Sequence, residues 1–360
     1  MTGDGGRRGG RVKLLQAGLG GWGRDWARSV LPEVPEVEPV GWIDVSERSL
    51  QLAQEQANVP LNRCFAALPD ALAACDAGRP DALLVTTDLP HHADAVREAL
   101  KAGLHVLVEK PFAPTVAEAR GLVELAERCG RVLMVSQNYR FHAVVREVAA
   151  LVRSAKLGRV DEVEIDFRRS SEPVDGVRRR HHLEEQPLLV DMSIHHFDLL
   201  RLVLSTEAER VYCRTWRPGW CAFSGPPAGA AIIEFEGGAI VSYRGSWISR
   251  GQATPWSGDW RLQCERGEIL WSGRGDRGAR QERLLVRRRP RGGADPSTVS
   301  EQLYELAPLR YPDRAGALHE FADAILCDRS PETSGEDNLK SLELMEAAVA
   351  SSVAGTPVQV

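Results

Sequence analysis

The sequence predicts an α/β protein with a doubly wound parallel sheet, followed by an α+β region with a large, mostly antiparallel sheet. Two observations support this fold class. Short apolar strands alternate with helical stretches up to about Ser136, a pattern typical of βαβ units, whereas strands follow one another directly beyond a helix at 141–155. The 360 residues suffice for two cores. We expect a disordered lead at 1–10, a first domain with the doubly wound sheet at 11–138 and a second domain at 139–360.

The expected elements follow from apolar runs and their period. In the first region we expect strands at 12–17, 37–43, 82–86, 105–108 and 132–136, and helices at 24–31, 90–102 and 115–129. In the second region we expect strands at 160–168, 208–216, 228–235, 239–246, 260–265, 268–270 and 282–288, with hairpin turns at 237–238 and 266–267. Helices at 314–327 and 336–353 could pack against either domain.

The first strand runs into a Gly-x-Gly-x-x-Gly motif, at 18–23, that opens a helix. Gly18 permits the tight turn, Gly20 lets a pyrophosphate approach the backbone, and Gly23 allows close packing of helix on strand. Together with Gly21 and Trp22, these residues predict a dinucleotide site.

The second strand ends at Asp44, 21 residues after Gly23. An acidic side chain there accepts hydrogen bonds from the adenosine ribose and repels a 2′-phosphate, so NAD is the expected cofactor. Ser46 and Arg48 follow closely and could accommodate a 2′-phosphate, so NADP is not excluded.

The segment 189–198 places Asp191, His195 and Asp198 at i, i+4 and i+7, on one face of a predicted helix. Histidine titrates near neutrality, and a neighbouring carboxylate can orient it for abstracting a proton from an alcohol. An ordinary hydrogen-bonded pair would have the same spacing; Asp198 is expected to support the helix.

The strand 105–108 ends in Glu109-Lys110-Pro111. A lysine at the carboxyl edge of a parallel strand points toward the crevice where a nicotinamide binds, and it can polarise a substrate oxygen. A surface lysine at a strand end is the alternative interpretation.

With these motifs in order, residues 11–360 resemble the glucose-fructose oxidoreductase and inositol dehydrogenase family (Gfo/Idh/MocA). The resemblance rests on the glycine motif, the His92 segment, 102–111, 138–141, Asp191-x-x-x-His195 and 335–338. It implies active-site roles for Lys110, Asp191 and His195, and the tight turn that the family makes after its strand implies a cis Lys110-Pro111 bond. The family often has glycines before this aspartate and a glycine two residues after it. This chain has Gln186-Pro187-Leu188 and Ser193 at those places.

Further residues are expected to contact the cofactor or the substrate. We assign Thr86, Thr87, His92 and Glu109 to the cofactor, in addition to Lys110. Asn138 and Arg140, which follow the last strand of the first domain, are assigned to nicotinamide or substrate. His196 and Trp256 are assigned to the substrate, since an aromatic ring in a loop can pack against a sugar.

The expected protein is therefore an NAD(P)-dependent oxidoreductase acting on a secondary alcohol of a sugar, sugar derivative or cyclitol. Whether Lys110 or His195 is the formal base stays open. A redox-neutral glycosidase or eliminase that uses NAD transiently, and a non-catalytic nucleotide-binding regulator, remain alternatives.

Composition excludes several other classes of protein. A net charge of −5 gives no reason to expect nucleic-acid binding, and no apolar run approaches a membrane span. Seven scattered cysteines without a Cys-x-x-Cys pair predict reduced thiols in the cytoplasm, and the paired histidines lack the partners of a metal site. Apolar residues on both faces of 228–235 and 239–246 predict a homodimer or homotetramer formed through the outer face of the sheet.

Overall fold

The computed structural model describes residues 10–74, 78–173, 176–275, 282–289 and 299–360. They fall into two compact units: the described residues up to Asn138 with Arg310–Leu339, and Tyr139–Leu309 with Lys340–Val360. The expected disordered lead, apart from Gly10, and Cys75 lie outside the described residues.

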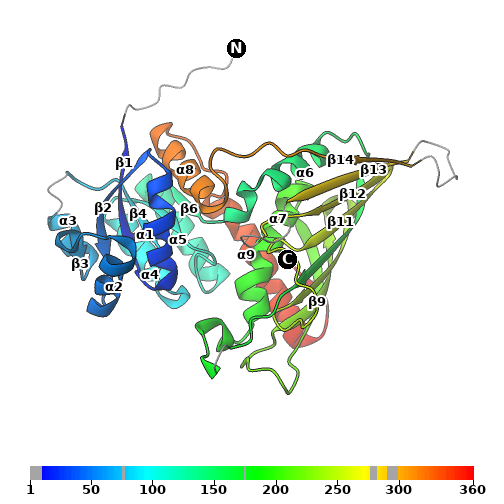
Figure 1. Ribbon diagram of the computed structural model, residues 1–360, viewed down its shortest axis with the longest axis horizontal. Coiled ribbons are helices and arrows are strands. Elements are labelled where there is room, and N and C mark those ends of the chain that lie inside the picture. The colour runs from blue at the N-terminus through cyan, green and yellow to red at the C-terminus, as the bar shows by residue number, and fades with distance from the viewer. Residues whose placement is uncertain (1–9, 75–77, 174–175, 276–281, 290–298) are drawn as a thin grey trace, which may run out of the picture. The chain divides into compact units, whose positions relative to one another are not determined.

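The first unit alternates strands and helices (Figure 1). Its elements are β1 (Val12–Ala17), α1 (Gly21–Ser29), β2 (Val37–Ile43), α2 (Glu47–Ala57), β3 (Cys64–Phe65), α3 (Leu68–Ala73), β4 (Ala82–Val85), α4 (Leu89–Lys101), β5 (His105–Val108), α5 (Val116–Cys129), β6 (Leu133–Val135) and α8 (Asp313–Leu326).

The six strands of this unit form one parallel sheet in the order β3-β2-β1-β4-β5-β6. The predicted doubly wound sheet is therefore confirmed. The strand order reverses between β1 and β4, and in such sheets ligands bind at the carboxyl ends of the strands beside this reversal.

Helix α8 belongs to the first unit although it lies far along the chain. It packs against β1, β5 and the 3₁₀ turn η1 (Leu31–Glu33), and it buries Leu318 and Phe321 there. Sequence alone left the partner of this helix open, because an apolar face does not say which surface covers it.

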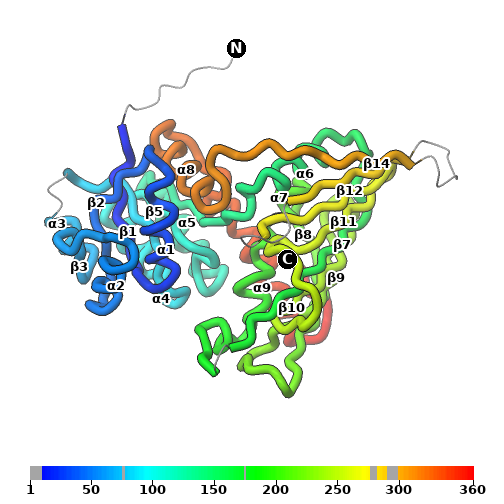
Figure 2. The backbone as a smooth tube through the Cα atoms, in the orientation of Figure 1, coloured from blue at the N-terminus to red at the C-terminus, as the bar shows by residue number. Residues whose placement is uncertain are grey.

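The second unit begins within the 3₁₀ turn η3 (Asn138–Phe141) and continues through a succession of strands, which Figure 2 traces along the backbone. Its elements are α6 (Ala143–Arg153), β7 (Val160–Arg168), the π-helical turn η6 (Leu188–Ser193), α7 (Ile194–Leu204), β8 (Ala208–Trp216), β9 (Ala228–Phe235), β10 (Ile240–Ser246), β11 (Asp259–Cys264), β12 (Gly267–Ser272), β13 (Arg283–Arg288), β14 (Ser300–Leu303), α9 (Gly335–Ala354) and β15 (Val358–Gln359). Helix α9 belongs to this unit from Lys340 to its end, and its first turn belongs to the first unit.

The second sheet has nine strands in the order β14-β13-β12-β11-β7-β10-β9-β8-β15. Among the described strands of this second sheet, only β7 and β10 pair in parallel, so the expected mostly antiparallel sheet is confirmed. Gly237 and Gly238, at φ 80° and 88°, close the predicted β9–β10 hairpin. Every second residue of β10 is buried, and α6, α7 and α9 lie on one face of the sheet (Figure 1).

Three properties are noted for the described residues alone. None of their helices combines the length and apolarity needed to cross a membrane. Six cysteines in these ranges are free thiols. No three histidine, cysteine or acidic side chains gather there in a group that could hold a metal ion.

Candidate functional site

The glycine-rich turn between β1 and α1 is shaped by close backbone contacts. Gly18 has φ +91°, and a Cβ there would lie 2.5 Å from the Thr87 nitrogen; a Cβ on Gly23 would lie 1.9 Å from the Gly18 oxygen. At Gly20 and Gly21, by contrast, a Cβ would meet no described atom within 4 Å, and no described side chain caps α1. The turn thus presents open backbone at a helix N-terminus, which fits a pyrophosphate.

Asp44 lies at the carboxyl end of β2, beside this turn. Its Oδ2 accepts the Leu19 N–H at 2.6 Å and its Oδ1 accepts the Ser46 N–H at 2.8 Å. Each carboxylate oxygen has further lone pairs for ribose hydroxyls. The Ser46 hydroxyl accepts the Ser49 N–H as the cap of α2, and Arg48 is exposed.

The end of β4 carries the two threonines expected at the cofactor. Thr86 is buried, and its hydroxyl lies 2.7 Å from the Gly18 oxygen, so it holds the turn in place. The Thr87 hydroxyl is buried without a hydrogen-bond partner among the described residues. A bound dinucleotide could supply that partner.

His92, on α4, connects the end of β4 with the turn after β5. Its buried ring has Nδ1 2.8 Å from the Pro111 oxygen and Nε2 3.0 Å from the Thr87 oxygen. The histidine therefore supports both loops from beneath.

The carboxyl end of β5 brings Glu109 and Lys110 to the same sheet edge as the glycine turn. One oxygen of buried Glu109 accepts the indole N–H groups of both Trp22 and Trp26 at 2.7 Å. Lys110 is half-buried, and the predicted cis Lys110-Pro111 bond is confirmed.

The expected helix at 189–198 differs from a uniform α-helix. Asp191 lies in the π-helical turn η6, and the α-helix α7 begins only at Ile194. The Ile194 N–H bonds the Leu189 oxygen, five residues back, and the Ser193 hydroxyl donates to the Leu188 oxygen. The single-face row expected for Asp191, His195 and Asp198 assumed α-helical spacing throughout, and the π-helical turn interrupts that spacing at Asp191.

His195 lies on α7 in a stack of planar side chains. Its buried ring is parallel to that of Tyr139, with centroids 4.0 Å apart. The Arg274 guanidinium covers Tyr139 at 4.5 Å and donates to its hydroxyl at 3.0 Å. Tyr139 and Arg274 were not expected from the sequence, although Tyr139 lies within a motif that signalled the resemblance.

Trp256 is held in place by a hydrogen bond with His196, which lies in the same unit. The His196 ring is completely buried, accepts the Tyr243 hydroxyl at Nδ1 and donates from Nε2 to the Trp256 oxygen at 3.0 Å. Burial lowers the pKa of His196 to about 4, although the bond to Trp256 acts in the opposite direction. The Arg169 guanidinium covers the Trp256 ring at 4.0 Å.

Asp191 lies close enough to His181 for their charges to interact. Burial lowers the pKa of His181, as does its neighbour His182, while the charge of Asp191 opposes the change. His181 lies 2.8 Å from the Ser171 hydroxyl. No sequence signal separated His181 from an ordinary loop histidine.

Arg140 and Asp198 form a buried ion pair. Two bonds of 2.7 Å join the guanidinium to the carboxylate, which also accepts from Ser341 at 2.8 Å. Asp198 thus supports the helix, as expected. Asn138, in the first unit, donates to Asp313 at the start of α8.

Comparison with known proteins shows which family the chain belongs to. Residues 12–137 match the profile described as "Oxidoreductase family, NAD-binding Rossmann fold", and residues 145–270 match the "GFO/IDH/MocA C-terminal domain". The chain is 27% identical over 297 residues to D-apiose dehydrogenase of Paraburkholderia graminis, covering 81% of this chain and 76% of that one. It is 25% identical over 287 residues to D-xylose 1-dehydrogenase (NADP(+)) 2 of Haloferax volcanii, covering 78% and 80%.

The fold agrees with a solved structure over the whole chain. An inositol dehydrogenase homolog from Azotobacter vinelandii, crystallised with NAD+, has a TM-score of 0.80 at 20% identity and covers 100% of both chains. At that identity the likeness concerns the fold. The two matched profiles identify this chain as a member of the Gfo/Idh/MocA family of oxidoreductases, with an NAD-binding Rossmann domain.

Proposed function

We propose that the protein is an NAD-dependent dehydrogenase that oxidises a secondary alcohol of a sugar, sugar derivative or cyclitol. The observation that carries the proposal is the carboxyl edge of the first sheet, where Lys110 follows β5 on the edge that holds the glycine turn. A cation on this edge is suited to polarise an oxygen bound beside a nicotinamide.

In the proposed reaction, bound NAD+ supplies the acceptor for the hydrogen that leaves the alcohol carbon with its electron pair. His195 takes the hydroxyl proton, and Lys110 stabilises the developing alkoxide; which of the two is the formal base stays open. Asp191 orients the substrate or His195. The stack with Tyr139 restricts the His195 ring to one plane, so that the proton acceptor is oriented in advance.

The remaining candidates divide into contacts and supports. The pyrophosphate is received by the glycine turn, at Gly18, Gly20, Gly21 and Gly23, with the Trp22 side chain beside the cofactor, and Asp44 receives the ribose. Thr87 offers its hydroxyl, while Thr86, His92 and Glu109 hold the loops. On the substrate side, His196 acts through Trp256, and Arg140 anchors η3 to α7 through Asp198.

The preference for NAD rests on Asp44. Its carboxylate lies beside the turn, the Ser46 hydroxyl is used in capping α2, and Arg48 is exposed. A 2′-phosphate would therefore meet a negative charge first.

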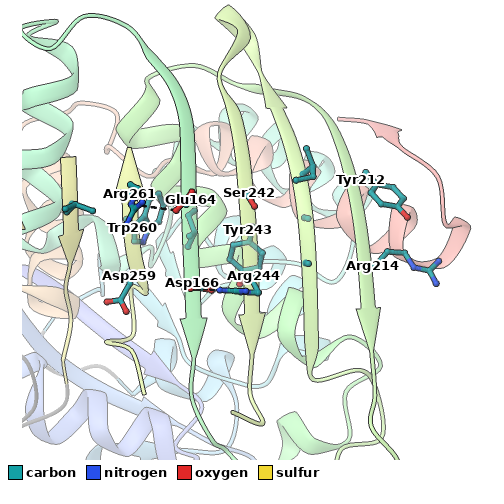
Figure 3. A pocket seen from close by; sticks show the side chains of 15 residues that line it. Glu164, Asp166, Tyr212, Arg214, Ser242, Tyr243, Arg244, Asp259, Trp260 and Arg261 are labelled. Atoms are coloured by element: carbon teal, nitrogen blue, oxygen red, sulfur yellow. Dashed lines mark hydrogen bonds and ion pairs between the residues drawn. The ribbon is translucent and has the colours of Figure 1, made fainter. Parts of the chain in front are cut away.

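We also propose a homo-oligomer formed through the outer face of the second sheet. A hollow of about 550 Å³ lies on this sheet and is lined by residues that include Tyr212, Ile232 and Arg244. Figure 3 shows Tyr212 and Arg244 among the side chains around it. Tyr212 and Ile232 are 40% and 44% exposed, while the Arg244 guanidinium pairs with Asp166 at 2.6 Å. Exposed apolar side chains around paired charges are suited to a second copy of the same surface.

The function is tested by incubating the full chain with NAD+ and a panel of aldoses, aldonates, polyols and cyclitols while NADH formation is followed. Continuous NADH formation with one member supports the proposal. Substrate turnover without accumulated NADH would indicate a redox-neutral reaction instead. Tight NAD+ binding without conversion of any member would favour a regulator.

A further inference from the structure

The indole of Trp22 in the glycine-rich turn is fixed at its edge and on its face. The edge N–H donates to Glu109 at 2.7 Å, and the face is covered by the Arg314 guanidinium, whose Cζ lies 4.2 Å from the ring centroid. Even so, the Trp22 residue is 47% exposed. A large aromatic side chain is thus held in one orientation and still presents surface to a ligand.

Arg314 comes from α8, beyond both segments matched by the family profiles. It also approaches Trp26 at 5.5 Å, and its Nη2 donates to Asp25 on the same face of α1. Burial alone would raise the pKa of Asp25, but the hydrogen bond and charge of Arg314, together with hydrogen bonds from Arg28 and Ser29, lower it overall. Arg314 is therefore a partly buried cation, with a side chain 14% exposed, that joins three side chains of the helix carrying the glycine turn.

A purely structural arginine uses all its buried hydrogen-bond donors, and Arg314 does not. Its Nη1 is buried and has no hydrogen-bond partner among the described residues. A simple ion pair between α8 and α1 would be satisfied by Asp25. The unsatisfied nitrogen suggests that the guanidinium is placed for its contact with the Trp22 ring.

The direction of the Trp22 side chain indicates which half of the dinucleotide it faces. Its edge bonds Glu109 at the end of β5, whereas the ribose-binding Asp44 ends β2, and β1 and β4 lie between these two strands. In this sheet type the adenosine half lies on the β2 side of the reversal and the nicotinamide half on the other. The Trp22 indole therefore extends toward the nicotinamide half.

We propose that Arg314 and Glu109 are positioning residues of the cofactor site. Together they hold the Trp22 indole as a wall against the nicotinamide half of NAD. Arg314 acts through Trp22, so its contribution to binding depends on the presence of that ring.

The test compares Arg314→Met, Arg314→Lys, Trp22→Leu and the double variant Trp22→Leu/Arg314→Met. Calorimetric titrations of the full chain with NAD+ and with AMP give the dissociation constants. The matched control is Arg310→Met, because Arg310 lies in the same segment and also covers an aromatic ring, that of Tyr311, at 5.0 Å.

Arg314→Met should weaken NAD+ binding about 5- to 10-fold, with AMP binding changed less than about twofold, since a cation on an indole ring is worth that much when partly desolvated. Arg314→Lys keeps a cation over the ring and should recover part of the loss. In the Trp22→Leu background, Arg314→Met should cause no further loss. Arg310→Met should behave as wild type.

Three results would overturn the proposal. Equal weakening of NAD+ and AMP would assign Arg314 to general stability of α1. Additive losses in the double variant would mean that Arg314 acts on the cofactor without Trp22. Unchanged NAD+ binding in Arg314→Met would leave it with no role at the site.

Discussion

The charge of Asp44 should decide which dinucleotide this protein prefers, and Asp44→Asn isolates that charge. The two side chains have the same size, and asparagine keeps one acceptor oxygen. Asp44 uses its oxygens for different partners, Leu19 N–H and Ser46 N–H, so asparagine can retain only one of these bonds. Losing the other bond should destabilise the ordered conformation of the loop by about 1 kcal/mol.

The two cofactors should respond in opposite directions. Unit charges 4 Å apart interact by about 4 kcal/mol at an effective dielectric of 20, and we discount this to about 1–2 kcal/mol because Asp44 is half-buried and reached by solvent. NADP+ binding should therefore tighten about 5- to 30-fold. NAD+ exchanges a charged acceptor for a neutral one and should bind about 5-fold more weakly.

Calorimetric titration of both dinucleotides into wild type and variant measures these changes. Ser46→Ala is the control, because the Ser46 hydroxyl caps α2 and should affect both cofactors alike. Tighter binding of NADP+ than of NAD+ by the wild type would refute the reasoning. So would an Asp44→Asn variant in which both affinities change by the same factor.

Three further predictions follow. Lys110→Ala and His195→Ala should each lower turnover by about 10²–10⁴-fold with nearly unchanged NAD+ affinity, and the double variant should be little worse than the poorer single one; retained turnover would remove that residue from the mechanism. Because the His196 pKa is about 4 when folded and 6.5 when unfolded, stability should be lost as pH falls from 6.5 toward 4, by about 2 kcal/mol at pH 5. Urea unfolding at pH 7.5 and pH 5 should show a smaller drop for His196→Gln, and an equal drop would contradict this. Light scattering at micromolar concentration should show an oligomer; a monomer would exclude assembly through the outer sheet face.

Local pattern was sufficient for most elements of the fold. Strands such as β2, β7 and β8 have the predicted limits, because each is an apolar or alternating run closed by turn residues. The edge strand β14 (Ser300–Leu303) was missed, since all four of its residues are exposed and show no hydrophobic period. The π-helical turn η6 was missed for a related reason. Apolar spacing predicts a helix, but it does not show whether the backbone hydrogen bonds join residues five positions apart or four.

For the candidate site, the sequence was enough to predict the residues that depend on a backbone requirement or on a place at a strand end. Gly18 and Gly23 belong here because no Cβ fits, and Asp44 and Lys110 because parallel strands end at one edge. The distant side chains that support them became visible in the folded chain alone. The stack of Tyr139 on His195 and the Arg314 guanidinium on Trp22 join residues 56 and 292 positions apart, and no local periodicity records which surfaces the folded chain brings together.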